Sequence, residues 1–471
     1  MRRTKIVATL GPATRNPEIV SGLIAVGVDV FRLNLSHGTR DEHEQLVAMV
    51  RRACDRGGRQ VGLLADLPGP KLRLGSIDGG LRQLRNGQNL TLTVDPAHGP
   101  QDALSVAWTG LPGAVSRGDT IYLADGSIRL RVRESGDSDV LTRVETGGTI
   151  ASHQGINLPG VDATPSSVGE EDLAWIDFAV EQEIDLIAVS FVRHASDLEA
   201  VFGRLAERGA DTPVIAKIEK REAAENAESI VQKCTGGVMV ARGDLGIEMP
   251  IEQIPLIQKR ILSLAGRYSK PSITATQMLA SMVSAPRPTR AEATDVANAI
   301  FDGTDALMLS EETAVGRYPV EAVRTMARIA EQTEKELPYG DWLQNRTAHL
   351  SRDVADTVSY GVVAAAYQLG LAALVVPTRS GRTARLVSAH RPQVPILALS
   401  PRPETARRVN LLWGVTGGYN EEPMTLEELL EDCAEQAKNY GFANSGDLIG
   451  VTAGLAGQRL GTNLFEVHRV P

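Results

Sequence analysis

The sequence predicts an α/β protein built on an eight-stranded parallel (β/α)8 TIM barrel, with an inserted all-β lid domain and a C-terminal α/β domain. Eight short runs rich in Val, Ile and Ala mostly alternate with helical patterns, as such a barrel requires. Nearly every run ends in a charged or hydroxyl residue, and barrel enzymes place their chemistry at that end of the strands. A doubly wound sheet would also alternate, but the position of the polar residues favours the barrel. The expected barrel strands are 5–11, 28–35, 61–67, 186–192, 213–219, 237–241, 272–277 and 306–310.

The alternation is interrupted between residues 72 and 159. Gly-containing turns at 78–80, 117–119 and 125–126 separate short runs of period two, such as 128–132. This pattern indicates an all-β domain inserted after the third barrel strand. The expected domains are therefore the barrel (1–70 and 161–335), the inserted lid (71–160) and the C-terminal domain (350–471).

The C-terminal part has the pattern of an open α/β sheet. Its expected strands are 371–378, 395–400, 447–453 and 463–470, with a helix at 425–440. The polar stretch 334–352, which contains Pro338 and Gly340, is interpreted as a linker. Residues 360–377 are apolar enough to resemble a membrane span, but Gln368 and Gly370 divide them into a helix and a strand.

Composition excludes several classes of protein. The 471 residues carry 49 Lys and Arg against 58 Asp and Glu, so the net charge of −9 disfavours nucleic acid and anionic membranes as partners. The cysteines Cys54, Cys234 and Cys433 form no Cys-x-x-Cys pair, which argues against a disulfide framework or a zinc ribbon. With no recognisable export signal, we expect a folded protein of the cytoplasm.

The run 214–219 places Lys217 and Glu219 on one face of a strand, pointing into the barrel mouth. A carboxylate there suits a hard divalent ion, and the ammonium can neutralise a transferring phosphoryl group or an enolate. A structural ion pair is an equally weighted alternative for these two residues.

The next strand runs into Arg242-Gly243-Asp244, where Asp244 offers a second carboxylate to the same ion. Two protein oxygens leave room for water and substrate, as Mg²⁺ prefers. The backbone amides of this turn would hold a substrate carboxylate or phosphate if they open a helix. A simple helix cap is the alternative.

Other polar residues follow strand ends. Arg32, Asn34 and Ser36 share a face, and Arg32 is placed to hold a phosphate bidentately. Asp66 ends the third run, and Thr276 lies in the seventh, where an isolated Thr is usually only a strand former. Lys71 and Arg73 follow where the chain leaves for the insertion, and on their own they are more simply explained as a solvated hinge.

Several long motifs in order resemble the pyruvate kinase family over the whole chain. They are LGPAT (10–14), RLNLSHG (32–38), AKIE (216–219), MVARGDLG (239–246), TATQML (274–279), RAE (290–292), DVAN (295–298) and GTN (461–463). The resemblance implies a barrel, a mobile β lid and a regulatory C-terminal domain, assembled as a homotetramer. It implies transfer of the phosphoryl group of phosphoenolpyruvate to ADP, giving pyruvate and ATP in glycolysis.

The resemblance also assigns roles. Glu219 and Asp244 match ligands of the divalent ion, Mg²⁺ or Mn²⁺, and Lys217 matches the group that stabilises the transition state. Arg32 and Arg73 match residues that grip the phosphoryl group, and Asn34 and Arg73 are expected near the nucleotide. The substrate is expected to contact the turn formed by Ala241, Arg242 and Gly243, with Asp244 beside it, and the hydroxyl of Thr276 near the site of protonation.

One departure concerns the monovalent cation. Many family members bind K⁺ through residues matching Asn34, Ser36, Asp66 and the next position, with a Glu where this chain has Lys71. Here the next position is Leu67, which has no hydroxyl. Because the Lys71 ammonium would supply the missing charge, we expect activity without K⁺. The alternative is that Lys71 points to solvent and Asp66 still binds K⁺.

The C-terminal domain offers a candidate effector loop. Its hydroxyls, amides and guanidinium groups form a plausible phosphate nest that resembles the family's effector loop, so we expect activation by a phosphorylated effector. A surface turn without a ligand is the alternative. The loop comprises Thr378, Arg379, Ser380, Gly381, Arg382 and Thr383.

Two rivals to the kinase are a metal-dependent enolate lyase or aldolase and a non-catalytic phosphometabolite sensor.

Overall fold

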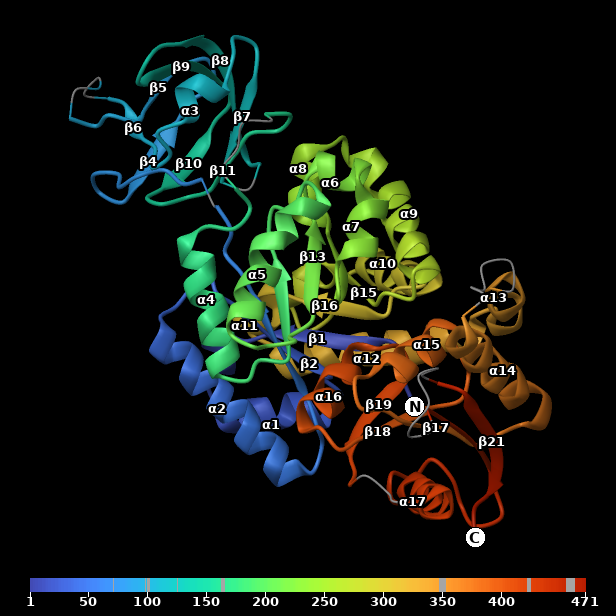
Figure 1. Ribbon diagram of the computed structural model, residues 1–471. Coiled ribbons are helices and arrows are strands. Elements are labelled where there is room, and N and C mark those ends of the chain that lie inside the picture. The colour runs from blue at the N-terminus through green and yellow to red at the C-terminus, as the bar shows by residue number, and fades with distance from the viewer. Residues whose placement is uncertain are drawn as a thin grey trace.

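The computed structural model describes residues 1–70, 72–97, 99, 102–124, 126–161, 166–346, 353–421, 425–454 and 462–471. Figure 1 shows three parts. A barrel with surrounding helices occupies the centre, a β-rich part projects from one end of it, and a C-terminal α/β part packs near the other end.

The barrel is closed by eight parallel strands, as the sequence predicts. Their order around the barrel is β1-β16-β15-β14-β13-β12-β3-β2. Several of the expected runs extend past the carboxyl end of the matching strand, and their last residues turn toward the mouth. The strands are β1 (Lys5–Thr9), β2 (Val30–Asn34), β3 (Gly62–Asp66), β12 (Leu186–Val189), β13 (Val214–Ile218), β14 (Gly237–Ala241), β15 (Ser272–Ala275) and β16 (Ala306–Leu309).

Both faces of the barrel strands are buried, which explains why they are apolar without alternation. Inward residues such as Val7, Leu64 and Met239 form one cluster that fills the barrel. Outward residues such as Ile6, Leu63 and Val240 belong to a second cluster beneath the helices. Burial on both sides holds the strand ends, and hence the polar residues that follow them, in fixed positions.

The helices around the barrel begin at recognisable signals. Capping boxes at Thr39 with Glu42 and at Thr289 with Glu292 start two of them. Three short helices, α6 (Arg221–Glu225), α8 (Arg242–Glu248) and α11 (Glu311–Ala314), follow strands directly at the mouth. The outer helices are α1 (Pro17–Ala25), α2 (Arg40–Gly57), α4 (Glu170–Glu181), α5 (Glu199–Glu207), α7 (Ala227–Lys233), α9 (Ile254–Arg267), α10 (Arg290–Phe301) and α12 (Pro319–Thr333).

The chain between β3 and β12 forms sheets of its own. A six-stranded sheet has the order β11-β7-β8-β9-β5-β6, and β4 pairs with β10. These strands enclose a separate apolar cluster that includes Leu90, Ile121 and Val140. The elements are β4 (Leu81–Leu84), β5 (Asn89–Thr93), β6 (Leu104–Ser105), α3 (Leu111–Ala114), β7 (Thr120–Leu123), β8 (Ile128–Ser135), β9 (Asp139–Thr146), β10 (Gly148–Ala151) and β11 (Ile156–Asn157).

The C-terminal part is a five-stranded sheet of order β19-β18-β17-β20-β21, in which only β21 runs antiparallel to its neighbour among the described pairings. It contains one strand that the sequence did not predict, β19. The elements are α14 (Val354–Leu369), β17 (Ala373–Pro377), α15 (Arg382–Ala389), β18 (Ile396–Ser400), α16 (Pro403–Arg408), β19 (Val415–Tyr419), α17 (Leu426–Asn439), β20 (Leu448–Ala453) and β21 (Leu464–Arg469).

Two glycines hide β19 from a propensity-based prediction, because glycine weakens a strand pattern. A Cβ at Gly417 would lie 1.8 Å from the carbonyl oxygen of Ala406, so close packing against α16 requires glycine there.

The expected linker 334–352 is also wrong in part. Its described portion contains the helix α13 (Tyr339–Arg346), in which Tyr339 and Leu343 are buried.

Among the described residues, no helix combines the length and apolar character needed to cross a bilayer.

The C-terminal part is joined to the barrel at the amino-terminal ends of the barrel strands. Arg391 pairs with Asp305 at 2.8 Å, and Arg407 pairs with Asp185 at 2.7 Å. Leu411, which follows α16, belongs to the same buried cluster as the residues inside the barrel. The C-terminal part therefore closes the end of the barrel opposite the mouth.

A buried carboxylate, Asp29, contributes to this closed end. It accepts from the guanidinium groups of Arg2 at 2.7 Å and Arg59 at 2.9 Å, and Lys5 Nζ lies 3.7 Å away. Lys5 also donates to the carbonyl oxygen of Val415 in β19 at 2.5 Å. Burial alone would raise the pKa of Asp29, but the charges of Arg2, Lys5 and Arg59 lower it from 3.8 to about 2.

This depressed pKa predicts acid sensitivity. The folded protein holds its Asp29 proton less tightly than the unfolded chain, so the contribution is present above pH 3.8 and is lost as the pH falls toward 2. We expect Asp29→Asn to remove on the order of 2 kcal/mol of stability at neutral pH and to flatten the loss between about pH 4 and 2. Urea unfolding across that range measures both effects, and an unchanged pH profile would contradict the assignment.

Candidate active site

Polar side chains from neighbouring strand ends meet in a cavity of about 130 Å³ at the barrel mouth. The inserted part contributes to the wall through the segment at β11. The polar lining residues are Arg32, Asn34, Ser36, Asp66, Asn157, Ser190, Lys217, Glu219 and Asp244, joined by Pro68, Gly155, Ile156 and Phe191.

Lys217 lies at the centre of this group. Its Nζ is 3.3 Å from Asp66 Oδ1 and 3.3 Å from Glu219 Oε2, and it donates to Ser190 Oγ at 2.7 Å. Arg32 reaches the other oxygen of Asp66, with Nε 2.7 Å from Oδ2. Two cations and two carboxylates thus form one connected cluster.

The cluster fixes the charge states of its members. Burial disfavours the ionised form of Asp66, but Lys217 and Arg32 outweigh it and lower the pKa of this carboxyl. Burial likewise opposes the charge on Lys217, yet Asp66 and Glu219 raise its pKa well above the usual range. Lys217 is therefore a permanent cation in the cavity.

Glu219 differs because it is incompletely satisfied. Its Oε1 accepts from the backbone N–H of Phe191 at 2.6 Å. Its Oε2 is buried and accepts no hydrogen bond, although Lys217 Nζ lies nearby. Burial raises the pKa of Glu219, and the like charge of Asp244 adds to the effect against the opposing charge of Lys217. An unsatisfied buried carboxylate oxygen near a second carboxylate is where a hard cation would be stabilised.

The described residues contain no group of three or more His, Cys, Asp or Glu side chains arranged to hold a metal ion. Glu219 and Asp244 are thus a pair, and a cation between them would take its other ligands from water or substrate.

The short helix α8 carries Asp244 in its first turn. Gly243 donates its backbone N–H to Thr276 Oγ1 at 2.7 Å, which ties the start of α8 to the end of β15. The guanidinium of Arg242 pairs with Asp295 at 2.7 Å and donates to the carbonyl of Thr276 at 3.0 Å. Arg242 anchors the turn formed with Ala241 and Gly243.

Thr276 lies just beyond β15, not inside a strand as the run 272–277 suggested. Its φ is +70°, and Gln277 follows with φ +54°. A β-branched residue in this region is strained, and such residues cluster at functional sites. The strain turns the chain so that the hydroxyl meets α8, which a propensity argument cannot foresee.

Other predicted residues lie at or beyond the edge of the cavity. Arg73 is not among the lining residues, and its Nη1 donates to the carbonyl of His153 at 3.1 Å within the inserted part. Asn34 Oδ1 accepts from the backbone N–H of Ser36 at 3.3 Å. The side chain of Leu67 is buried, and Lys71 lies outside the described residues.

Sequence reasoning missed two residues of the site. Ser190 bridges Lys217 to the carbonyl of Leu67, to which its hydroxyl donates at 2.7 Å. Phe191 holds Glu219 through its backbone, in a conformation with φ +57°. The available signal was the hydroxyl of Ser190 near the end of the run 186–192, but no pattern distinguishes a backbone donor such as Phe191.

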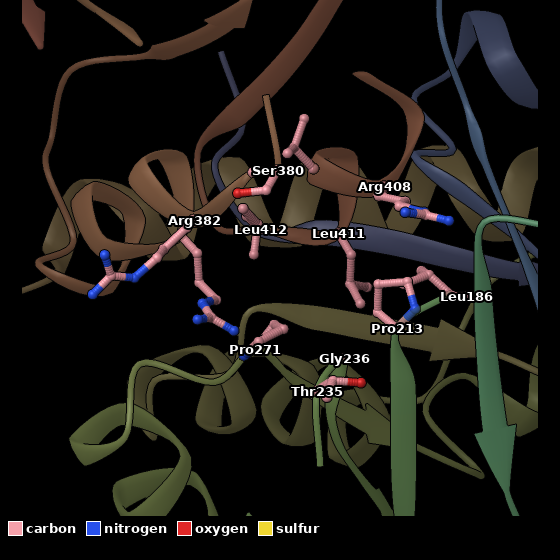
Figure 2. Close-up of a pocket in the computed structure, with 13 residues that line it drawn as sticks. Leu186, Pro213, Thr235, Gly236, Pro271, Ser380, Arg382, Arg408, Leu411 and Leu412 are labelled. Carbon is pink, nitrogen blue, oxygen red and sulfur yellow. The ribbon is translucent and has the colours of Figure 1, made fainter. Parts of the chain in front are cut away.

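The expected effector loop lies between β17 and α15, far along the chain from this cavity. Thr378 Oγ1 accepts from the N–H of Gly381 at 3.0 Å, and Arg379 accepts through its carbonyl from Thr405 at 2.9 Å. Thr383 Oγ1 is 2.6 Å from Thr462 Oγ1. Ser380, Gly381 and Arg382 line a separate cavity, which is shown in Figure 2.

The barrel and its mouth define a class of enzyme. A fixed cation, an arginine, and a pair of carboxylates of which Glu219 keeps one oxygen without a hydrogen bond suit chemistry on phosphorylated substrates or enolates, which depends on charge neutralisation more than on covalent catalysis. The same elements in a chain with an inserted β part and a C-terminal α/β part point to a phosphotransferase.

Comparison with known proteins identifies the family. Residues 1–323 match the family model described as the pyruvate kinase barrel domain, and residues 356–468 match the pyruvate kinase alpha/beta domain. A pyruvate kinase of Bacillus licheniformis is 42% identical over 473 residues, covering 100% of this chain and 81% of the relative. One of Geobacillus stearothermophilus is 42% identical over 99% of this chain and 80% of the relative. One of Thermotoga maritima is 39% identical over 100% of both chains. The chain belongs to the pyruvate kinase family and is a phosphotransferase.

A second buried ion pair holds one end of α8, the helix that carries Asp244. Lys220, directly after Glu219, lies 2.5 Å from Glu248 Oε1 at the end of α8, and both side chains are buried. Burial raises the pKa of Glu248 despite the charge of Lys220. With Arg242 at one end of α8 and Glu248 at the other, the helix that carries Asp244 is held at both ends.

We predict strong coupling between these two residues. Glu248→Leu leaves Lys220 buried without a partner and is expected to cost about 3–5 kcal/mol of stability. The double variant Lys220→Met/Glu248→Leu removes both charges and is expected to recover most of that loss. Urea unfolding of the wild type, both single variants and the double variant measures the coupling, and additive losses would show that the pair does not act as a unit.

Proposed function

We propose that this protein transfers the phosphoryl group of phosphoenolpyruvate to ADP, giving ATP and an enolate that is protonated to pyruvate in glycolysis. The observation that carries the proposal is the permanent Lys217 cation between Asp66 and Glu219 at the mouth of the barrel. Membership of the pyruvate kinase family supports the choice of reaction.

Lys217 neutralises negative charge on the phosphoryl group as it leaves the enolate oxygen. Asp66 and Ser190 hold the ammonium in place, so it needs no reorganisation during the reaction. Arg32 grips the same phosphoryl group. Asp66 binds its Nε and Thr9 binds its Nη1 at 3.1 Å, while Nη2 has no hydrogen-bond partner among the described residues.

A divalent ion, Mg²⁺ or Mn²⁺, fits between Glu219 and Asp244. The unsatisfied Oε2 of Glu219 and the repulsion between the two carboxylates support this assignment. When bound, the ion would neutralise phosphoryl and enolate oxygens. Glu219 and Asp244 would hold it, and Lys217 would complete the positive side of the site.

The turn at the start of α8 orients the substrate. Within the turn formed by Ala241, Arg242 and Gly243, the backbone N–H of Gly243 donates to the hydroxyl of Thr276, and the guanidinium of Arg242 donates to the carbonyl of Thr276. We assign Thr276 to the region where the enolate carbon is protonated. The hydroxyl of Thr276 already accepts a hydrogen bond from Gly243. The position of the turn would therefore set the position of this hydroxyl, and of any water that it orders, relative to the enolate carbon.

The inserted part is proposed to act as a lid, with boundaries 71–160 between barrel segments 1–70 and 161–335 and with the C-terminal domain at 350–471. Arg73 belongs to the lid hinge and pairs with Gly155 across an isolated antiparallel bridge. Lid closure would bring Arg73 to the phosphoryl group and, with Asn34, to the nucleotide.

The monovalent cation is proposed to be dispensable. Asn34, Ser36 and Asp66 lie near the cavity, but Leu67 provides an apolar side chain where relatives carry a hydroxyl ligand. The Lys71 ammonium would take the place of K⁺. A homotetramer in the cytoplasm, activated by a phosphorylated effector through residues 378–383, completes the proposal.

The test is pyruvate formation from phosphoenolpyruvate, ADP and Mg²⁺, with and without K⁺ in a buffer free of Na⁺. We expect turnover in both conditions. Lys217→Met is expected to lower kcat by about 10²–10³-fold because it removes a preorganised charge from the transition state. The matched control Arg52→Gln, which changes an exposed cation on α2, should keep the wild-type rate.

Turnover that requires K⁺ would keep the phosphotransferase reaction and contradict the role of Lys71. Absence of turnover from folded protein, tested with a panel of phosphorylated effectors, would contradict the proposed reaction.

A further inference from the structure

Two consecutive residues after β12 contact the two charged side chains at the end of β13. Ser190 Oγ accepts from Lys217 Nζ at 2.7 Å, and the backbone N–H of Phe191 donates to Glu219 Oε1 at 2.6 Å. Glu219 Oε2 accepts no hydrogen bond among the described residues. The direction in which Glu219 presents that oxygen therefore depends on where the N–H of Phe191 lies.

Phe191 has a backbone conformation that a residue with a side chain rarely adopts. Its φ is +57°, in the left-handed region. Such a conformation persists only where the surrounding structure holds it in place. The contacts of the Phe191 ring are therefore part of what places its N–H beside Glu219.

The ring of Phe191 lies directly against the backbone of Gly69. A Cβ at Gly69 would lie 2.7 Å from Cδ2 of Phe191 and 3.1 Å from Cβ of Ser190, closer than side chains pack. Gly69 itself has φ +64°. Glycine is required at this position both for its own conformation and for the close approach of the ring.

Gly69 is in turn anchored to the barrel. Its N–H donates to Asp172 Oδ1 at 2.8 Å, and Asp172 Oδ2 accepts from the N–H of Gly169 at 2.9 Å, at the start of α4. Gly69 precedes the inserted part and Gly169 follows it, so one buried carboxylate joins the two barrel segments at the base of the insertion. The surface on which the ring rests is thus fixed.

Phe191 also faces the two chain segments that connect the barrel to the inserted part (Figure 1). The N–H of Ile156 in the second segment donates to the carbonyl of Leu72 in the first at 2.8 Å. Lys220 Nζ lies 6.0 Å from the centroid of the Phe191 ring. The residues that line a small cavity of about 30 Å³ there are Pro70, Leu72, Ile156, Asn157, Leu158, Phe191 and Lys220.

We propose that Phe191 is a positioning residue for Glu219. Its ring, seated on Gly69, holds the strained backbone whose N–H fixes Oε1, and this leaves Oε2 available to the divalent ion. The proposal rests on the proposed function, because the ion site that it supports contains Glu219. It gives the base of the inserted part a role in ion binding in addition to its role as a hinge.

The ring carries this role, although the hydrogen bond comes from the backbone. Any residue other than proline supplies an N–H at this position. A smaller side chain would make fewer contacts with Gly69, and the chain could relax toward an ordinary conformation that draws the N–H away from Oε1. If the ring only filled space, its removal would lower stability and leave the affinity for the ion unchanged.

The experiment separates these two roles by measuring ion binding and stability on the same variants. Mn²⁺ is titrated into the full chain without substrate, and the electron paramagnetic resonance signal of free Mn²⁺ gives the Kd. Urea unfolding of the metal-free protein gives the stability. We expect Phe191→Ala to weaken Mn²⁺ binding on the order of tenfold or more, as loss of a group that orients a metal ligand does.

Phe202→Ala is the matched control. Phe202 is a half-buried ring on α5, near Lys233 and outside the candidate site. Its removal is expected to lower the stability and to leave the Kd for Mn²⁺ at the wild-type value.

Gly69→Ala tests the seat of the ring. The added Cβ would displace Phe191, so we expect a similar loss of Mn²⁺ affinity. In the Phe191→Ala background the same change should weaken Mn²⁺ binding little further, because the displaced ring is already absent. Losses of affinity that multiply would contradict action through the ring. If Phe191→Ala does not fold, Phe191→Leu replaces it, with a weakening in the same direction.

Equal Mn²⁺ affinity in the wild type and Phe191→Ala would overturn the proposal. If Glu219→Gln still weakened binding in that case, the ion site of the proposed function would stand without this role for Phe191. A wild-type protein that binds no Mn²⁺ would contradict the ion site itself, and the positioning role with it.

Discussion

The buried carboxylate of Asp66 sets the charge arrangement of the barrel mouth. It is almost fully buried at the end of β3, and it is stable in that position as an anion because Arg32 and Lys217 contact its two oxygens. Lys217 in turn compensates part of the charge of Glu219. Among the described residues, one oxygen of Glu219 accepts no hydrogen bond, and the like charge of Asp244 raises the pKa of Glu219; we propose that this negative charge makes the site receptive to a divalent ion.

Polar contacts fix both ends of the barrel, but they position the candidate site at one end and hold the C-terminal part at the other. At the mouth, the strained turn at Thr276 holds the start of the short helix α8, which carries Asp244. At the opposite end, paired charges such as Arg391 with Asp305 hold the C-terminal part against the strand starts. Because each barrel strand spans the distance between the ends in four or five residues, the two sets of charges are separated by little more than one strand.

The sequence predicts the barrel well because apolar runs with polar ends are a direct consequence of burial on both faces and exposure at the mouth. Lys217, Glu219 and Asp66 were found from that pattern, and the cavity brings them together. The role of Ser190, the φ of Thr276 and the strand β19 escape it, because each depends on a neighbour distant in the chain.

Glu219 and Asp244 are proposed to form a divalent-ion site that is completed when a cation binds. The most direct measurement is Mn²⁺ binding to substrate-free protein, followed by the electron paramagnetic resonance signal of free Mn²⁺. The account predicts a site in the wild type that Glu219→Gln weakens on the order of tenfold or more, since it removes one of two charged ligands. Glu252→Gln, an exposed acid near α9, should leave the affinity unchanged. Equal Mn²⁺ affinity in the wild type and Glu219→Gln would contradict the account.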